Sequence, residues 1–444
     1  MKLNLGASDA QLRPTTRLLL GRMLSSRSGL TPRFSFIMRS ALEPNIAVAA
    51  GDMTGVHILY GQPSPGVYHI SGTGTSYEGA IIRVLAETIE RYAQYISAVI
   101  ERQKVVSASY HSMVTNSRVL MPENLQYFSD GQLGRPGFPF SRLSADRVIG
   151  WISAKSLLDG SICWVPAQIA LIGYLWQSDE PQFMLGVSTG TAAHTRLDQA
   201  LRNALLELIQ IDAAMGNWYG NQLPVLIQLG NNARTQTVEE LIGRHLHRYG
   251  PIPRFYWLPS ADLPALTIAC VIEGQEVPKF AVGLGCDPCL ARAMYKAFLE
   301  GVAVAKLAKV TMFRQAMRDV PSVADPSQMY DLDSNVAYYA VEGRSTFRTK
   351  FGDSPGVSPS DLPRDVDSDI KGDLRHLVDG FAGTGKELVF LDLTTADIRD
   401  LGFYVVRVWS PDTISLSLPS APPVMHPRFQ AYGGIRNEAP HPYP

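Results

Sequence analysis

Apolar residues recur at helical spacing in three long stretches of the chain. The clearest stretch is residues 80–103, where apolar side chains return every three or four positions, at Ile81, Leu85, Ile89, Tyr92 and Ile96. This spacing places the side chains along one face and predicts an amphipathic α-helix. Residues 200–218 and 291–310 predict two further long helices.

The three predicted helices share one local context. Each follows an apolar, strand-like run and a glycine-containing turn, within residues 71–80, 187–199 and 280–290. Each helix also carries a glutamate about two turns after its start, and these are Glu87, Glu207 and Glu300. We interpret the stretches as three diverged versions of one unit, too dissimilar to form a repeat at the level of sequence.

The segments between and after these helices predict strands. Apolar runs occupy residues 225–230, 254–259, 265–274 and 279–285, and two more lie at 387–394 and 402–411. Strands that alternate with helices predict an α/β or α+β fold. We expect a lead-in at residues 1–58 and one large composite domain at 59–444. Residues 319–373 are rich in Pro, Ser and Asp and predict a long, partly mobile insertion.

Composition narrows the class of protein. The 444 residues are 45% hydrophobic and 18% charged, as in an ordinary folded protein with a sizeable core. The net charge of −1 provides no overall field that would attract nucleic acid or an anionic membrane. The longest apolar run, residues 163–176, is shorter than the ~20 residues of a spanning helix. The chain has only four cysteines and no secretory signal at the N-terminus. Together with the short apolar run, these features predict a cytoplasmic protein without a membrane anchor.

Carboxylates are the most informative polar residues. Glu87 and Glu90 stand three positions apart on one helix face, with Arg91 beside them. Taken alone, they are also compatible with a solvated, charged helix face. If Glu207 and Glu300 converge on them, the four would form the oxygen-lined type of site that Mg²⁺ prefers beside nucleotide phosphates. The glycine turns could present backbone N–H groups to phosphate oxygens, although the sequence contains neither a GxxxxGK[ST] P-loop nor a GxGxxG motif.

Two further motifs have alternative interpretations. Cys286 and Cys289 form a CxxC that could be half of a zinc site or a redox pair, but no second ligand pair accompanies it. We favour two small residues at the start of a helix. His245 and His247 lie two positions apart on a predicted helix, so their side chains would point in different directions.

Five segments in this order resemble the YcaO family, and they lie at residues 71–92, 188–212, 283–300, 392–412 and 437–444. The resemblance implies a YcaO-like composite domain with mixed sheets and helices around a carboxylate-lined nucleotide site, without a P-loop. It implies ATP and Mg²⁺ as cofactors. The implied metal ligands are Glu87, Glu90 and Glu207. The implied cofactor-binding residues are Ser71, Arg91, Asn203, Gln210, Lys296 and Glu300.

The sequence departs from the family pattern at several of these positions. Thr73 stands where a lysine is frequent, and Arg83 stands where a small residue is common. Gln210 and Ile211 replace a usual glutamate–arginine pair. Lys296 stands where arginine is usual and lacks the planar fork of a guanidinium.

The C-terminus ends with proline at every second position, at Pro440, Pro442 and Pro444. Proline fixes φ and lacks a backbone donor, so the tail is expected to be extended and able to enter a cleft. Such an ending resembles the azoline-forming members of the family, which implies that these prolines belong to the catalytic site and that the terminal carboxylate acts as a general base.

The resemblance predicts an ATP-dependent cyclodehydratase subunit. A Cys, Ser or Thr side chain of a precursor peptide would attack the preceding backbone carbonyl, and phosphorylation of the amide oxygen would allow a thiazoline or oxazoline to form. Another amide activation, giving a thioamide or an amidine, is one alternative. A non-catalytic scaffold in a modification complex is the other, and the departures from the family pattern support it.

The expected partners follow from this function. They are the precursor peptide and a separate protein that binds its leader, because the sequence contains no recognisable leader-binding domain. A flavin dehydrogenase would be a further partner if the azolines are oxidised. The sequence leaves open whether the chain forms a homo-oligomer.

Overall fold

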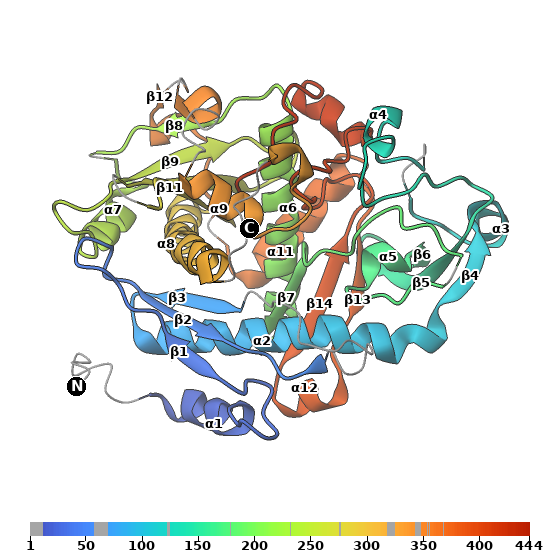
Figure 1. Cartoon of the computed structure of the whole chain (residues 1–444), viewed down its shortest axis with the longest axis horizontal. Coiled ribbons are helices and arrows are strands. Elements are labelled where there is room, and N and C mark those ends of the chain that lie inside the picture. The colour runs from blue at the N-terminus through green and yellow to red at the C-terminus, as the bar shows by residue number, and fades with distance from the viewer. Residues whose placement is uncertain are drawn as a thin grey trace.

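The computed structural model describes most of the chain (Figure 1). The described residues are 12–56, 70–121, 125–177, 179–230, 232–274, 277–317, 325–341, 348–352, 354, 356–366 and 368–444. All statements below refer to these residues.

Three sheets form the framework. The first contains, in spatial order, β1 (Phe34–Phe36), β2 (Ala47–Gly51) and β3 (Ser71–Gly74). The second contains β11 (Phe280–Asp287), β10 (Leu266–Glu273), β9 (Pro253–Leu258), β8 (Val225–Ile227) and β12 (Gly356–Val357). The third contains β4 (Val106–Ser109), β5 (Val148–Ser156), β13 (Val389–Asp392), β14 (Tyr404–Trp409) and β7 (Thr191–His194), and β6 (Ile162–Pro166) pairs with β5. All pairings are antiparallel except that of β12 with β8, so the mixed fold is of the α+β kind.

Three long helices pack against these sheets, as the apolar periodicity predicts. They are α2 (Tyr77–Ile100), α6 (Leu197–Tyr219) and α8 (Leu290–Met317). The shorter helices are α1 (Pro14–Met23), α3 (Tyr110–Asn116), α4 (Asp130–Leu133), α5 (Ala167–Ala170), α7 (Gln236–Gly243), α9 (Ser334–Val341), α11 (Ile370–Gly383) and α12 (Ala396–Asp400).

The long helices and the strands before them form three β–α units that close into a ring. Each helix packs on its own preceding strand, giving the units β3–α2, β7–α6 and β11–α8. In addition, α2 contacts β7, α6 contacts β11, and α8 contacts β3. Each helix therefore touches the strand of the next unit, and the third unit returns to the first. The threefold recurrence in the sequence corresponds to this arrangement.

Glycine allows strand and helix backbones to approach closely within two of these units. A Cβ on Gly72 would lie 2.3 Å from the carbonyl oxygen of Ala80 in α2. A Cβ on Gly285 would lie 2.3 Å from the carbonyl oxygen of Ala293 in α8. The prediction of a turn at residues 71–74 is therefore wrong, because these residues form β3 and their glycines serve backbone packing. Among the glycines of residues 71–80, 187–199 and 280–290, only Gly190, with φ +79°, has the left-handed conformation that a turn requires.

The described parts of residues 319–373 contain regular elements that pack on the core. Phe351 is buried and lies edge-on to Tyr256 of β9, with 5.0 Å between the ring centroids. The ranges 318–324 and 342–347 lie outside the described residues, so the mobility of the insertion stays a prediction, as do the domain boundaries. The helix expected at His245 and His247 is wrong, because α7 already ends at Gly243. Among the described helices, none is both long and apolar enough to cross a membrane.

Candidate active site

The three glutamates of the β–α units converge because each occupies the same place in its helix. Glu87, Glu207 and Glu300 each lie ten residues after the first residue of α2, α6 and α8. The ring of units then brings the three helices together. The charge of Glu87 acts on both Glu207 and Glu300, and that of Glu300 acts on Glu207. The predicted convergence of carboxylates from three helices therefore occurs.

Burial and the charges of neighbouring carboxylates raise the pKa values of Glu90, Glu207 and Glu300. Burial, with the charges of Glu87 and Glu300 added and that of Arg91 opposing, raises the pKa of Glu207 to about 8. Burial raises the pKa of Glu300 to about 7, against a hydrogen bond from the backbone of Leu284. Burial and the charge of Glu87 also hold the pKa of Glu90 well above its ordinary value. The site thus contains more negative charge than its own cations balance.

Arg91 is the cation that these carboxylates surround. Its guanidinium lies 2.7 Å from Glu87 and 3.9 Å from Glu90, and the charge of Glu207 also raises its pKa. It also donates a hydrogen bond of 3.2 Å to Gln94. The alternative of a solvated helix face is wrong, because the Glu90 side chain is only 13% exposed and Glu87 and Arg91 are about three-quarters buried.

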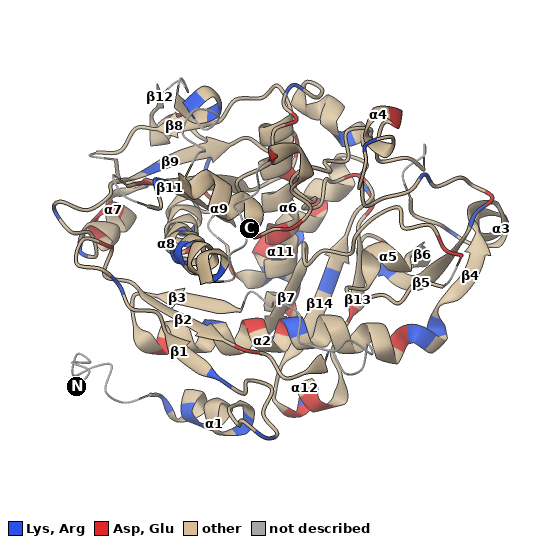
Figure 2. Cartoon of the chain, viewed as in Figure 1, with Lys and Arg blue, Asp and Glu red and all other residues tan. Residues whose placement is uncertain are grey.

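A second buried arginine was missed by the sequence reasoning. Arg407 lies on β14, next to β7, and its side chain is 1% exposed. Burial lowers the pKa of Arg407 to about 10, against the charges of Glu207 and Glu90. Figure 2 shows this basic segment of β14 above the charged middle of α2. A single charged residue in an apolar strand gives no periodic pattern, and only the sheet reveals that it faces the carboxylates.

The remaining predicted cofactor-binding residues surround the glutamates less directly. Asn203 lies one helical turn before Glu207 on α6 and accepts a hydrogen bond of 3.1 Å from Gln199. Gln210 lies on the same helix and is partly buried, and Ser71 is exposed at the start of β3. Their contact with a nucleotide stays a prediction.

Lys296 lies one turn before Glu300 but is already paired. Its Nζ donates to Asp287 at 2.9 Å and to the carbonyl oxygen of Cys286 at 3.0 Å. Asp287 also accepts from Arg202 and Arg292. Although burial would raise the pKa of Asp287, Lys296 and Arg202 lower it. Lys296 is 42% exposed, so its Nζ can reach a nucleotide. To do so it would have to share its hydrogen bonds between the nucleotide and Asp287, or break the bond to Asp287.

The proline-rich tail lies inside the protein, between α6 and α9 (Figure 1). Asn335 of α9 donates from Nδ2 to the carbonyl oxygens of His441 and Tyr443, at 2.8 and 2.7 Å. Trp218 of α6 donates to the carbonyl oxygen of Ala439 at 2.9 Å. Pro440 and Pro442 are buried, and the terminal Pro444 is only partly buried.

His441 helps to hold this tail in one conformation. Burial lowers the pKa of His441 to about 4, so its ring is neutral. Its Nδ1 accepts a hydrogen bond of 3.3 Å from the backbone N–H of Tyr443, and Nε2 therefore donates to the carbonyl oxygen of Ser417 at 2.8 Å. Prolines leave few backbone donors in the tail, and side chains of other segments satisfy its carbonyl groups instead.

The residues fit a divalent cation by their charge. Glu90, Glu207 and Glu300 have raised pKa values, and among the described residues Arg91 is the only cation in an ion pair with this group. A divalent ion would stabilise such a site. In the described ranges, however, no three carboxylate, histidine or cysteine groups are already close enough together to hold an ion. Arg91 occupies the position between the carboxylates instead. The assignment of Glu87, Glu90 and Glu207 as metal ligands stays a prediction.

The cysteine pair shows no feature of a metal or redox centre. Cys286 is buried at the end of β11, and burial raises the pKa of its thiol to about 12. Both Cys286 and Cys289 are free thiols. They stand at the junction of β11 and α8, as expected of residues at a helix start.

The comparisons with known proteins agree with this geometry. Residues 71–414 match the profile of the YcaO cyclodehydratases, which is described as ATP- and Mg²⁺-binding. Among curated protein sequences, none matches the chain.

Several solved structures share the fold at low sequence identity. A heterocyclase in complex with substrate and cofactor superimposes with a TM-score of 0.70 at 18% identity, over 100% of this chain and 59% of that chain. YcaO from Methanopyrus kandleri, bound with AMPPCP and Mg²⁺, gives a TM-score of 0.60 at 17% identity over 90% of each chain. A chain of the E. coli microcin synthetase McbBCD complex with pro-MccB17 gives 0.62 at 13% identity, over 95% of this chain and 99% of that chain.

The profile match covers all three β–α units and the strand that carries Arg407. It confirms the fold expected from the sequence, and it confirms ATP and Mg²⁺ as the cofactors of the family. The chain also spans only 59% of the length of the heterocyclase that it resembles. On the profile match and the shared fold, the chain belongs to the YcaO family of ATP-dependent cyclodehydratases.

Proposed function

We propose that this chain is the cyclodehydratase subunit that converts Cys, Ser or Thr residues of a ribosomally made precursor peptide into thiazoline or oxazoline rings. The observation that supports this most is the convergence of Glu87, Glu207 and Glu300 beside Arg91, in a chain of a family that binds ATP and Mg²⁺. The proline-rich tail resembles that of azoline-forming members and therefore favours ring formation over thioamide or amidine formation.

The chemistry needs a way to remove an amide oxygen. The side-chain thiol or hydroxyl attacks the preceding carbonyl carbon, its proton goes to a base, and the carbonyl oxygen becomes an oxyanion. The oxyanion takes the terminal phosphoryl group of ATP, which leaves ADP. Loss of the amide N–H proton then expels inorganic phosphate and forms the C=N bond of the ring. The peptide loses the atoms of one water, and phosphorylation has turned a poor leaving group into a good one.

The residues of the chain would divide this work. Glu87, Glu90 and Glu207 would hold Mg²⁺, which supplies positive charge to the phosphates when it is bound. Arg91, Asn203, Gln210, Lys296 and Ser71 would contact the nucleotide, and Glu300 would order the site.

We assign the base to the carboxylate of the C-terminus. Pro440 and Pro442 lie in the interior, and Asn335 fixes the carbonyl groups of the tail, so the end of the chain is held in one place. Pro444 is only partly buried, which leaves its carboxylate able to reach a substrate. The immobilised tail would then position the base at no further loss of entropy.

We also propose that a separate protein delivers the precursor peptide. The chain spans 59% of the length of the heterocyclase and 49% of that of the heterocyclase TruD. The McbBCD neighbours are complexes. In this proposal a leader-binding protein presents the precursor peptide, and a flavin dehydrogenase or a second copy of the chain would be an additional partner.

Intact-mass analysis tests the proposal. A candidate precursor peptide encoded beside the gene is incubated with this protein, its neighbouring partner, ATP and Mg²⁺. We expect a loss of one water per ring, and no loss with Glu87→Gln or Glu207→Gln, although both variants remain folded. Deletion of residues 440–444 should reduce ring formation more than ATP binding. Unchanged ring formation in both glutamate variants would refute the metal site. The absence of both product and nucleotide binding in the natural protein would favour a scaffold.

A further inference from the structure

A small pocket adjoins Arg407 and is not accounted for by the nucleotide site. It has about 20 Å³ of free volume, which is room for one or two water molecules. Its wall is mostly apolar and includes Tyr127, Ile169, Leu185, Trp409 and Leu416. Such a lining suits a small apolar side chain better than a charged group.

Arg407 contributes an unpaired donor to this pocket. Its two terminal nitrogens donate to the carbonyl oxygens of Val187 and Ile169, at 2.6 and 2.7 Å. These bonds hold the guanidinium plane in place. In the part of the chain that the structure describes, its buried Nε–H has no partner. A buried N–H of a cation without an acceptor is rare, because the unmade hydrogen bond is destabilising.

The same arginine lies beside the carboxylates of the nucleotide site. The charges of Glu207 and Glu90 both act on it. A group that accepts a hydrogen bond from Nε–H would therefore sit between the apolar pocket and the place where phosphoryl transfer is proposed.

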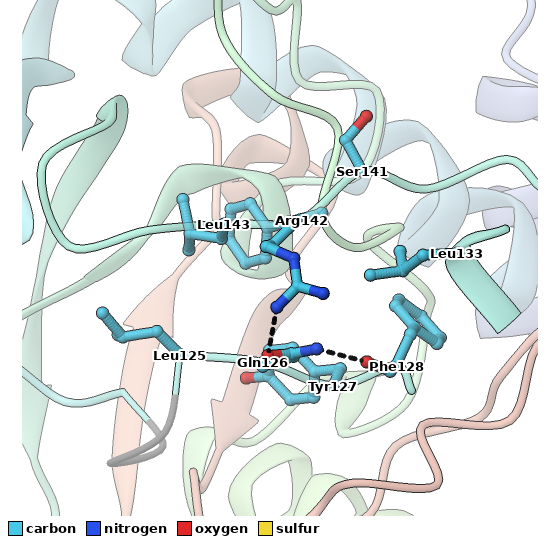
Figure 3. A pocket seen from close by; sticks show the side chains of 9 residues that line it. Leu125, Gln126, Tyr127, Phe128, Leu133, Ser141, Arg142 and Leu143 are labelled. Atoms are coloured by element: carbon cyan, nitrogen blue, oxygen red, sulfur yellow. Dashed lines mark hydrogen bonds between the residues drawn. The ribbon is translucent and has the colours of Figure 1, made fainter. Parts of the chain in front are cut away.

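The pocket lies next to a smaller hollow of about 10 Å³. Tyr127 lines both, and Figure 3 shows it in the hollow below Arg142. Arg142 donates a hydrogen bond of 3.1 Å to Gln126, at the open rim. Phe183 lines the hollow, and Met184, Leu185 and Val187 line the pocket, so the two depressions lie on either side of this segment.

Building on the proposed function, we infer that this pocket is the acyl subsite for the peptide. It holds the side chain of the residue that precedes the cyclised Cys, Ser or Thr, and the Nε–H of Arg407 donates to the carbonyl oxygen of that residue. The side chain and the carbonyl group belong to the same substrate residue. The apolar wall of the pocket would contact the side chain, and the Nε–H of Arg407 would bind the carbonyl oxygen. The bond to a cationic donor strengthens as the oxygen gains negative charge during attack.

The size of the pocket predicts a specificity. The free volume accommodates glycine or alanine before the cyclised residue, whereas leucine or phenylalanine would have to displace Tyr127 or Trp409. One or more misplaced methylene groups change kcat/KM by about ten- to a hundred-fold. We therefore expect a loss of that size between alanine and leucine at this position.

Leu185 offers a variant that changes the pocket without threatening the fold. Its side chain lines the pocket but is 36% exposed, and it is not part of the proposed catalytic machinery. Leu185→Ala should restore cyclisation of the leucine-containing peptide, and Leu185→Trp should reduce activity on every peptide except the glycine one. Leu229→Ala is the matched control, because Leu229 is 41% exposed and lies outside the pocket.

The experiment measures kcat/KM for peptides with Gly, Ala, Leu or Phe at this position, the KM for ATP, and the binding of the same peptides by calorimetry. A change of peptide preference in the Leu185 variants with an unchanged KM for ATP supports the subsite. A change in the KM for ATP alone, or the same preference in all variants, overturns it. If the natural protein binds the peptides in the predicted order but forms no ring, the proposed reaction fails and the subsite stands.

Arg407→Lys provides an independent measurement, because it retains the positive charge beside Glu207 but removes the Nε–H. We expect peptide kcat/KM to fall at least about tenfold while nucleotide binding is retained. Weaker nucleotide binding with normal use of peptide would assign Arg407 to the nucleotide instead. If this variant does not fold, the Leu185 series decides.

Discussion

Replacing Glu207 by glutamine should stabilise the protein without nucleotide while it abolishes function. The pKa of Glu207 rises from an ordinary 4.5 to about 8 because the carboxyl group is buried near Glu87 and Glu300. Between these two pH values the folded state retains a proton that the unfolded state has lost, so the stability that this group contributes falls as the pH rises. One unit of pKa difference corresponds to about 1.4 kcal/mol, so the full loss is about 5 kcal/mol above pH 8.

Glutamine resembles the protonated carboxyl group in shape and cannot ionise, so the variant should escape this loss. Arg91 keeps Glu87 as its ion-pair partner at 2.7 Å, and the charge of Glu90 still acts on Arg407. We expect Glu207→Gln to match the natural protein near pH 5 and to exceed it at pH 9 by about 2–5 kcal/mol.

Urea unfolding of both proteins from pH 5 to pH 9, without nucleotide, measures the effect. Glu240→Gln is the control, since Glu240 is 55% exposed and its replacement should change little at any pH. Adding ATP and Mg²⁺ should stabilise the natural protein, because only the folded state binds them, and leave Glu207→Gln unchanged. A variant that is less stable than the natural protein by the same amount at pH 5 and pH 9 would show that Glu207 does not carry an unfavourable buried charge.

Three further predictions concern the same interior. ATP and Mg²⁺ should bind more weakly at pH 6 than at pH 8, because Glu207 and Glu300 have pKa values of about 8 and 7 and must lose their protons when the metal binds. Calorimetry in two buffers measures the protons released, and binding that does not depend on pH would contradict the prediction. Arg428→Leu should destabilise the fold by about 3–5 kcal/mol in urea unfolding, because the buried carboxylate of Asp212 loses its ion-pair partner. Loss of an exposed ion pair elsewhere should change the free energy of unfolding by less than about 1 kcal/mol. Asn335→Asp replaces the amide that donates to the tail carbonyl groups by a carboxylate that can only accept, so kcat for ring formation should fall while the Kd for ATP stays the same. An equal loss of ring formation and of ATP binding would mean that the tail has only a structural role.

Local patterns in the sequence determined the three long helices and the residues on their faces. Steps of three and four apolar residues place Ile81, Leu85 and Ile89 on the buried face of α2, and the structure buries all three. The same periodicity puts Glu87 and Glu90 on one side of the helix. Four strands of the second sheet, β8 to β11, were also predicted, because their runs of apolar residues are bounded by Gly and Pro. The short β12 lies within the predicted insertion and was not predicted.

The contacts between distant segments were decided only by the tertiary structure. Arg428 reaches Asp212 across 216 residues, and Asn335 reaches His441 across 106, and neither pair leaves a pattern along the chain. The prediction of a glycine turn at 71–74 failed for the same reason. Glycine there is needed because α2 packs against β3, and a sequence does not show which backbone lies above which.

The active site combines both kinds of information. Helical periodicity, which depends on neighbours three and four residues apart, places a glutamate at the same position in each of three helices. Their convergence depends on the ring in which each helix packs on the strand of the next unit. It also depends on β14, which pairs with β7 and brings Arg407 to the carboxylates. Such contacts are set by the packing of whole elements, so only the folded structure reveals them.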